Sequence, residues 1–321
     1  MQTHPRSEGG RAPAAASPTA PGTAPAWRPP AKYQLRGVIG VGGMGTVWLA
    51  RDRNLDRLVA LKVLRTDCGK LLGRLRHEAR LLARLEHPAI VRVYELDVHD
   101  RRLYLAMEYA PGGSLATARC AAVPLLRTLR GVIDGLQHAH SNGVVHRDVK
   151  PENVLLSGAR GGERQRAPAV LADFGLALGP GEGNDVLRRP IVGTPLTMSP
   201  EQVAGTPIGP ASDVFSLGVT LYRVLSGRWP FPGRSVVEVF RAIRERAPVP
   251  LRCCGDRQVS RRLEAIVHKC LAKEPGERFA SMAELGRAVD RVLRARSWWT
   301  LPFAGRRPAV VCGADRTEVQ R

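Results

Sequence analysis

The chain has 321 residues, 44% of them hydrophobic, so it can bury a large core and is too apolar to be wholly disordered. Its formal net charge is +20, but the basic residues, 43 Arg and six Lys, are spread along the sequence. A nucleic-acid-binding protein would concentrate such charge in one stripe, so the composition does not favour that class of partner. No run of about 18 apolar residues and no apolar leader is present, so we expect neither a membrane span nor secretion.

The chain opens with a polar segment and then changes to alternating strand signals. Residues 1–30 are mainly Pro, Ala, Ser, Thr and Gly, which predicts a disordered tail. Short apolar runs separated by turn residues predict a β-meander over 33–64. Leucines at helical spacing predict a helix over 71–85, and two further strands are expected over 90–96 and 103–108.

After Pro111-Gly112-Gly113 the apolar pattern becomes helical. Helices are predicted from Pro124 to Ser141 and over 213–226, 235–246, 259–272 and 281–295, with a loop-rich centre between the first two. A sheet-rich part followed by a helix-rich part predicts an α+β fold of two lobes with a cleft between them. We place the lobes at 31–110 and 111–295 and leave the role of 296–321 unassigned.

The glycines of the first strands form a phosphate-binding candidate. Gly40, Gly42 and Gly45 give the pattern G-x-G-x-x-G, which alone is also compatible with a dinucleotide fold or an ordinary hairpin. A dinucleotide fingerprint opens a helix, whereas residues 46–50 are strand-like here. The context therefore favours a hairpin whose backbone N–H groups approach nucleotide phosphates.

Two charged residues occupy positions where an apolar side chain is expected. Lys62 ends an apolar strand, and Glu78 lies on the apolar stripe of the following predicted helix. Each charge needs an opposite partner when buried, so we expect an ion pair that holds the ammonium group for phosphates. An exposed Lys and a Glu at the edge of the stripe remain the alternative.

The segment 144–156 holds a polar loop between apolar runs that predict strands at 144–145 and 154–156. Asp148 and Asn153 are five residues apart, so one loop can offer a base and a metal ligand. A further carboxylate, Asp173, follows a predicted strand and precedes a Gly. Asn153 and Asp173 together could chelate Mg²⁺; turn capping is the alternative for either segment alone.

These residues resemble the eukaryotic-type Ser/Thr protein kinases found in bacteria, over about residues 33–293. The resemblance rests on the glycine loop and on many motifs in the family's order. They include Val59-Ala60-Leu61-Lys62, Glu78, His146-Arg147-Asp148, Asn153, Asp173-Phe174-Gly175, Gly193-Thr194-Pro195, Ser199-Pro200-Glu201, Asp213-Val214-Phe215-Ser216-Leu217-Gly218 and Arg278. The family fold implied is a two-lobed kinase with an ATP cleft.

The resemblance implies a role for each matching residue. Asp148 would orient the substrate hydroxyl and Lys150 would neutralise the γ-phosphoryl group. Lys62, paired with Glu78, would hold the ATP phosphates, and Asn153 with Asp173 would bind Mg²⁺. Glu201 and Arg278 would form a structural pair. The implied nucleotide site comprises Ile39, Gly40, Val41, Gly42, Gly43, Met44, Gly45, Val47, Ala60, Lys62, Met107, Glu108, Ala110, Asn153, Leu155 and Asp173.

One departure from the family pattern concerns how the activity is regulated by phosphorylation. Residues 176–192 contain no Ser, Thr or Tyr, although this segment commonly supplies the phosphorylated hydroxyl that pairs with the position of Arg147. We therefore expect that phosphorylation does not order this segment. The carboxylate of Glu182 or Asp185 would pair with Arg147 instead, more weakly than a phosphate. Phosphorylation of Thr194 or Thr197 is the alternative, although Thr194 resembles the family residue that contacts Asp148 and Lys150, where a phosphate would block the site.

The sequence thus predicts an ATP- and Mg²⁺-dependent Ser/Thr protein kinase that acts in signalling on Ser and Thr hydroxyls of protein substrates. Six cysteines without any Cys-x-x-Cys pair indicate reduced thiols and a cytoplasmic location. A pseudokinase scaffold that binds nucleotide and partner proteins is the alternative. A polyanion-binding protein is disfavoured by the dispersed charge, and nothing in the sequence indicates an oligomeric state.

Overall fold

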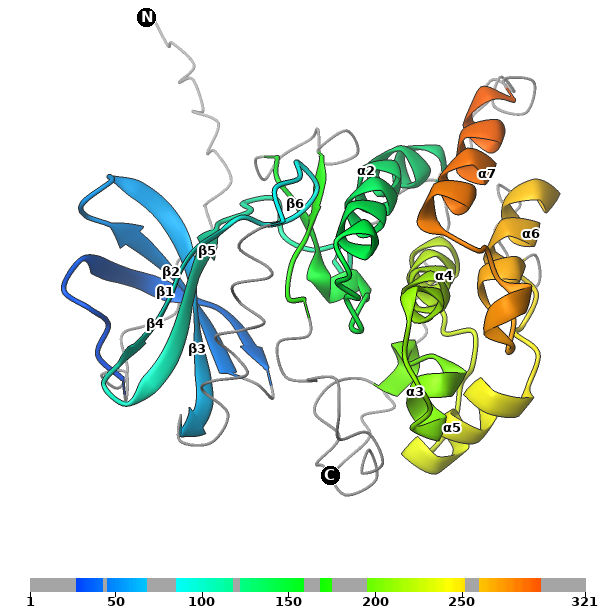
Figure 1. Cartoon of the computed structure of the whole chain (residues 1–321), viewed down its shortest axis with the longest axis horizontal. Coiled ribbons are helices and arrows are strands. Elements are labelled where there is room, and N and C mark those ends of the chain that lie inside the picture. The colour runs from blue at the N-terminus through cyan, green and yellow to red at the C-terminus, as the bar shows by residue number, and fades with distance from the viewer. Residues whose placement is uncertain are drawn as a thin grey trace, which may run out of the picture.

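The computed structural model describes residues 27–42, 45–67, 85–117, 122–158, 168–174, 195–251 and 260–295. They form two lobes, one built on a β-sheet and one on helices (Figure 1). The predicted two-lobed α+β fold is confirmed. A short hairpin of β6 (Val154–Leu156) and β7 (Ala169–Leu171) lies between the sheet and the helices.

The first lobe is an antiparallel sheet of five strands in the order β1-β2-β3-β5-β4. Because β5 pairs with β3, Ala60 lies opposite Met107 and Lys62 lies opposite Leu105. The predicted meander is confirmed, whereas the predicted helix over 71–85 lies almost wholly outside the described residues. The strands are β1 (Tyr33–Gly42), β2 (Gly45–Asp52), β3 (Arg57–Asp67), β4 (Val93–His99) and β5 (Arg102–Glu108).

The segment before β4 ties the sheet to the β6–β7 hairpin. A strand was predicted over 90–96, but β4 begins only at Val93. Upstream of it, Val91 N–H donates to Leu171 O (2.9 Å) and Leu171 N–H donates to Ala89 O (2.8 Å). The backbone of this segment therefore pairs with the hairpin instead of with the sheet.

Alternation along β3 gives the sheet two different faces. Val59, Leu61 and Val63 are buried on the outer face in a cluster with aromatic residues. Ala60 and Leu64 belong to a second cluster, which also holds residues of the β6–β7 hairpin. Lys62 lies between them and points to the same inner face of the sheet, so its side chain enters the cleft between the lobes.

Trp27 covers the outer face, which corrects the prediction that residues 1–30 are a tail. It is 3% exposed, and its indole Nε1 donates a hydrogen bond of 2.9 Å to the backbone carbonyl of His99. Its ring packs on Tyr104, with centroids 6.0 Å apart. The prediction used the average composition of residues 1–30, which is rich in Pro and Ala. An average of this kind does not register a single large side chain such as Trp27, which can bury a large apolar area by itself.

A carboxylate holds the same aromatic cluster together. Glu95 accepts hydrogen bonds from the hydroxyls of Tyr33 (2.6 Å) and Tyr104 (2.8 Å) and pairs with Lys32 (2.7 Å). Burial and these hydrogen bonds raise the pKa of both tyrosines, so the hydroxyls stay protonated as donors. Lys32 and Tyr33 are thereby fixed to β4 and β5.

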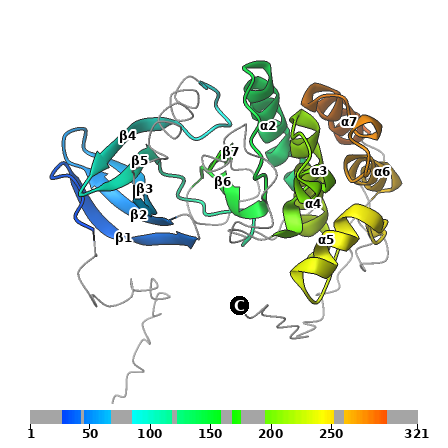
Figure 2. The same cartoon turned by 60° about the horizontal axis from the view of Figure 1, so that its bottom comes forward.

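The second lobe is built around α4 (Pro210–Ser226), which contacts both α2 and α6 (Figure 2). Every residue from Ser212 to Tyr222 is buried, as expected for a central helix. The predicted helices are confirmed within a few residues at each end. The others are α2 (Ala122–Ser141), α3 (Pro200–Ala204), α5 (Val236–Glu245), α6 (Arg261–Cys270) and α7 (Met282–Arg294).

Two local predictions in the loop-rich centre were wrong. No strand forms at Val144-Val145, because Val144 N–H bonds back to Ala139 O and closes α2 (2.9 Å). The short helix α3 was not predicted, although Ser199 and Gln202 form a capping box around Pro200. That pattern, with Pro at the first helical position, is a start signal for a helix.

None of the helices in the described ranges is long and apolar enough to cross a membrane.

The packing of Trp27 predicts a loss of stability on truncation. Trp27→Ala should lower the free energy of unfolding by about 3 kcal/mol, because a buried indole and its hydrogen bond are lost. Urea denaturation followed by circular dichroism would measure this change. Removal of residues 1–31 should have the same effect, whereas removal of residues 1–25 should not; equal stability of both truncated chains would contradict the packing.

Candidate active site

Four of the predicted site residues, Asp148, Lys150, Asn153 and Asp173, come together around one loop, residues 144–153, which we call the Asp148 loop. It follows α2 and leads into β6, and the end of β7 with Asp173 lies beside it. His146 is fully buried in this loop, with its ring centroid 4.4 Å from that of Phe174. The loop and the end of β7 therefore form one packed unit.

His146 also fixes backbone groups on both sides of the site. Its Nε2 lies 3.1 Å from Ala172 O, and its Nδ1 accepts a hydrogen bond from Asp148 N–H (3.2 Å). Complete burial lowers the pKa of His146, so the ring is neutral, with the proton on Nε2. A neutral ring can donate to one segment and accept from the other, as these contacts require.

Asp213, from the buried helix α4, anchors the loop backbone. Its two carboxylate oxygens accept the N–H groups of His146 and Arg147, both at 2.8 Å. His140 Nε2 of α2 lies 2.7 Å from the same carboxylate. Arg147 has a φ of +67°, a conformation that side chains rarely adopt and that surrounding contacts must hold.

The carboxylate of Asp148 is oriented by two neighbours in its own loop. Lys150 Nζ lies 2.7 Å from Asp148 Oδ2, and Asn153 Nδ2 donates to the same oxygen at 3.0 Å. Asn153 Nδ2 also donates to the backbone carbonyl of Asp148 (2.8 Å). Because the amide nitrogen is used in this way, the Asn153 oxygen is the atom left to bind a metal ion.

Lys62 contacts Asp173 across the cleft. Its Nζ lies 2.8 Å from Asp173 Oδ1, and the Lys62 side chain is only 9% exposed. Asp173 has a φ of +58°, so a strained backbone holds its carboxylate toward the sheet. The partner predicted for Lys62, Glu78, lies outside the described residues.

The donor chemistry of the site fits Mg²⁺ bound together with a nucleotide. No cluster of three or more His, Cys, Asp or Glu is present in the described ranges that could hold a metal by itself. Mg²⁺ in nucleotide sites is held by one or two protein oxygens, and phosphates and water complete its coordination. Asn153 and Asp173 supply oxygens of this kind beside the ammonium group of Lys62.

Five of the sixteen residues predicted for the nucleotide site share one apolar cluster. Ala60 and Met107 are buried in it with Val170 and Ala172, and Val47, Ala110 and Leu155 pack against it. The cluster combines both lobes, as a pocket for a flat apolar base requires.

The remaining residues predicted for the nucleotide site lie in the glycine hairpin of β1 and β2 and at the end of β5. Ile39 and Val41 are 42% and 68% exposed, and a Cβ at Gly45 would lie 2.1 Å from Val63 O. Gly45 is thus required by its close approach to β3. At the end of β5, the backbone N–H of Glu108 donates to Arg92 O (2.9 Å). Gly43 and Met44 lie outside the described residues.

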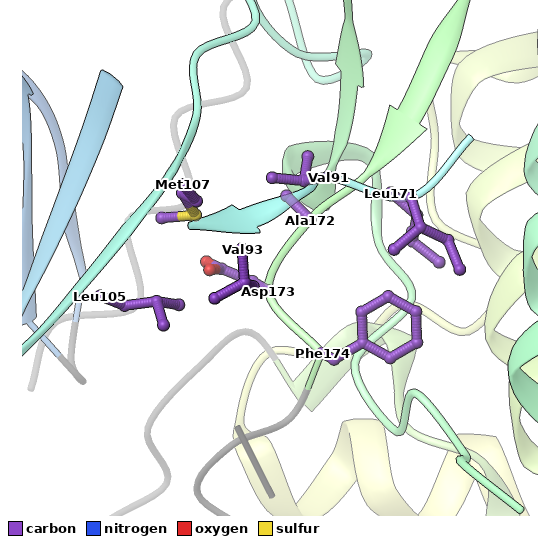
Figure 3. Close-up of a pocket in the computed structure, with 9 residues that line it drawn as sticks. Val91, Val93, Leu105, Met107, Leu171, Ala172, Asp173 and Phe174 are labelled. Carbon is purple, nitrogen blue, oxygen red and sulfur yellow. The ribbon is translucent and has the colours of Figure 1, made fainter. Parts of the chain in front are cut away.

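A cavity behind Met107 extends the cleft toward Asp173 (Figure 3). Its wall combines the sheet with the end of β7, and sequence reasoning had not included most of it. The apolar run before β4 was the available signal. The lining residues are Ile90, Val91, Val93, Leu105, Met107, Leu171, Ala172, Asp173 and Phe174.

The predicted structural pair Glu201–Arg278 is confirmed. Arg278 binds the two oxygens of Glu201 with separate nitrogens, at 2.7 and 2.8 Å, and both residues are buried. Burial alone would raise the pKa of Glu201, but hydrogen bonds from Arg278 and Ser212 keep it below its ordinary value.

Comparison with known proteins agrees with this geometry. The family model for the protein kinase domain matches residues 33–288. The chain is 37% identical over 303 residues to the serine/threonine-protein kinase PknB of Mycolicibacterium smegmatis, covering 90% of this chain and 46% of the relative. It is 34% identical over 263 residues to PrkC of Bacillus subtilis, covering 79% and 39% respectively. The chain thus spans less than half the length of these relatives.

The anchoring of the Asp148 loop predicts that Asp213→Asn lowers the free energy of unfolding by about 2 kcal/mol. An amide nitrogen would then meet a backbone N–H that needs an acceptor. Urea denaturation would measure the change. Asp134→Asn is a matched control, because that carboxylate is 51% exposed on α2. Equal effects of the two substitutions would contradict the anchoring role.

Proposed function

The chain belongs to the protein kinase family, and from this we propose that it transfers the γ-phosphoryl group of ATP to Ser and Thr hydroxyls of proteins. The observation that carries the proposal is the convergence of Asp148, Lys150 and Asn153 with the Lys62–Asp173 pair at one cleft. Relatives described as serine/threonine-protein kinases support the choice of hydroxyl. A role in signalling and a cytoplasmic location are part of the proposal.

In the proposed mechanism the chain's own residues act by position and charge. Asp148 accepts a hydrogen bond from the substrate hydroxyl and orients it for attack. Lys150 lies beside this carboxylate, where its charge opposes the negative charge that builds up on the transferred group. Mg²⁺, when held by Asn153 and Asp173, neutralises phosphate charge.

Lys62 is positioned to bind the non-transferred phosphates. Its ammonium group is desolvated in the cleft and lies 2.8 Å from Asp173. An ammonium group in such surroundings attracts anions more strongly than one in water. The apolar cluster around Ala60 and Met107 excludes water from the base of the nucleotide.

We predict that Asp148→Asn lowers the rate of phosphoryl transfer about 10³-fold while ATP still binds, because the hydroxyl loses its acceptor. Asp173→Asn should lower the rate and also weaken Mg²⁺-dependent ATP binding. The assay would follow transfer from ATP to purified protein substrates from a lysate, with phosphosites mapped. Asp56→Asn, on a turn with a side chain 71% exposed, is the control.

Two results would refute the proposed activity. One is an Asp148→Asn variant that turns over like the wild type. The other is a wild-type chain that binds ATP with Mg²⁺ but transfers no phosphate, which would identify a pseudokinase scaffold.

We further predict that full activity does not depend on phosphorylation of residues 176–192. That segment contains no hydroxyl, and Arg147 Nε has no hydrogen-bond partner among the residues that the structure describes. Thr197 is 4% exposed, which opposes its use as the phosphorylation site. Complete dephosphorylation should therefore leave the initial rate unchanged. A large rise in rate on autophosphorylation that disappears in Thr197→Val would contradict the prediction.

A further inference from the structure

Gln202 lies on α3 and bridges two parts of the site. It is 5% exposed. Its side-chain oxygen accepts the backbone N–H of Ser199 (2.9 Å), and its side-chain nitrogen donates to the backbone carbonyl of Arg147 (2.8 Å). The two ends of one amide thus join the start of α3 to the Asp148 loop.

The carbonyl that Gln202 holds belongs to the peptide bond that leads into Asp148. The N–H of the same peptide bond, which belongs to Asp148, donates to His146. The N–H of Arg147, in the preceding peptide bond, donates to Asp213. Three side chains from three segments therefore fix the backbone around the residue with a φ of +67°. Gln202 supplies the contact on the carbonyl side.

An uncharged amide, which has one acceptor and one donor, satisfies both contacts at this position. The Ser199 N–H needs an acceptor, and the Arg147 carbonyl needs a donor. A carboxylate would bring a second oxygen against that carbonyl, and an apolar side chain of equal length would leave both backbone groups without this partner. A glutamine at position 202 is thus suited to orient the Asp148 loop.

We propose that Gln202 is a positioning residue for Asp148, which couples α3 and the preceding residues 195–199 to the catalytic carboxylate. The proposal rests on the proposed kinase function. Residues 195–199 form a turn and cap directly before α3, so a protein substrate that contacts them would act on the same bridge. A shift of α3 would change the direction of the Arg147–Asp148 peptide and with it the Asp148 carboxylate.

The test compares Gln202→Glu and Gln202→Met with the wild type in steady-state kinetics. Both substitutions should lower kcat about 10- to 100-fold, because a misplaced catalytic group slows transfer, whereas the Kd for ATP with Mg²⁺ should not change. Gln137→Met is the control. Gln137 also uses its amide between segments, accepting Ala283 N–H (2.9 Å) and donating to Ser141 Oγ (3.2 Å), away from the cleft.

The pH dependence of Gln202→Glu distinguishes positioning from a general loss of packing. A protonated carboxyl group can again donate to the Arg147 carbonyl, and burial raises the pKa of such a group. The ratio of variant to wild-type kcat should therefore rise as the pH falls from about 8 to about 6. The other ionisable groups around this position are common to both proteins, so the ratio compares two chains that differ only in the group at position 202: these groups are His146, Arg147, Asp148, Asp213 and the Glu201–Arg278 pair.

Each result has a defined meaning. A ratio that stays constant with pH, or kcat values equal to that of Gln137→Met, would overturn the positioning role. Gln202→Glu preserves side-chain size, and its carboxyl group regains a donor when it is protonated, so it carries the test if Gln202→Met does not fold. Absence of transfer by the wild-type chain would instead refute the proposed function.

Discussion

The buried carboxylate of Asp213 is the interaction on which the site depends. It lies on the most completely buried helix of the second lobe and takes up two backbone N–H groups of the Asp148 loop. A buried charge without such donors would strongly destabilise the fold. Because the carboxylate and the loop satisfy each other, the strained conformation at Arg147 persists, and Asp148 is presented at the surface of a rigid support.

A second buried charge supports the same region from the opposite side. Arg278 donates to both oxygens of Glu201 and also to the backbone carbonyls of Ala211, Ala272 and Lys273. The guanidinium is therefore satisfied by several acceptors, which offsets its desolvation. The pair fixes α3 against the start of α4. Because Gln202 on α3 donates to the Arg147 carbonyl, the position of α3 also affects the position of that carbonyl.

The sequence predicted those parts that depend on local pattern. Helix α4 and its neighbours followed from apolar spacing, and the strands from alternation between turns. The pairing of Glu201 with Arg278 followed only from the resemblance to a known family. Trp27 and Gln202 were missed for a physical reason: their roles depend on single contacts with residues 72 and 55 positions away, which no periodicity records. The helix α3 had a local signal in its capping box, which was not used.

The two faces of β3 connect the start of the chain to the chemistry in the cleft. Val59, Leu61 and Val63 pack beneath Trp27 on one face, while Lys62, between them in sequence, meets Asp173 on the other. A strand cannot shift on one face without moving the other, because neighbouring side chains share one backbone. The outer aromatic cluster therefore helps to set the distance between the Lys62 ammonium and the Asp173 carboxylate, and the second lobe sets it independently through the packing of Phe174 on His146. The cleft geometry thus depends on two scaffolds, which meet at this pair, at the short backbone pairing before β4 and in the apolar cluster of Ala60, Met107, Val170 and Ala172.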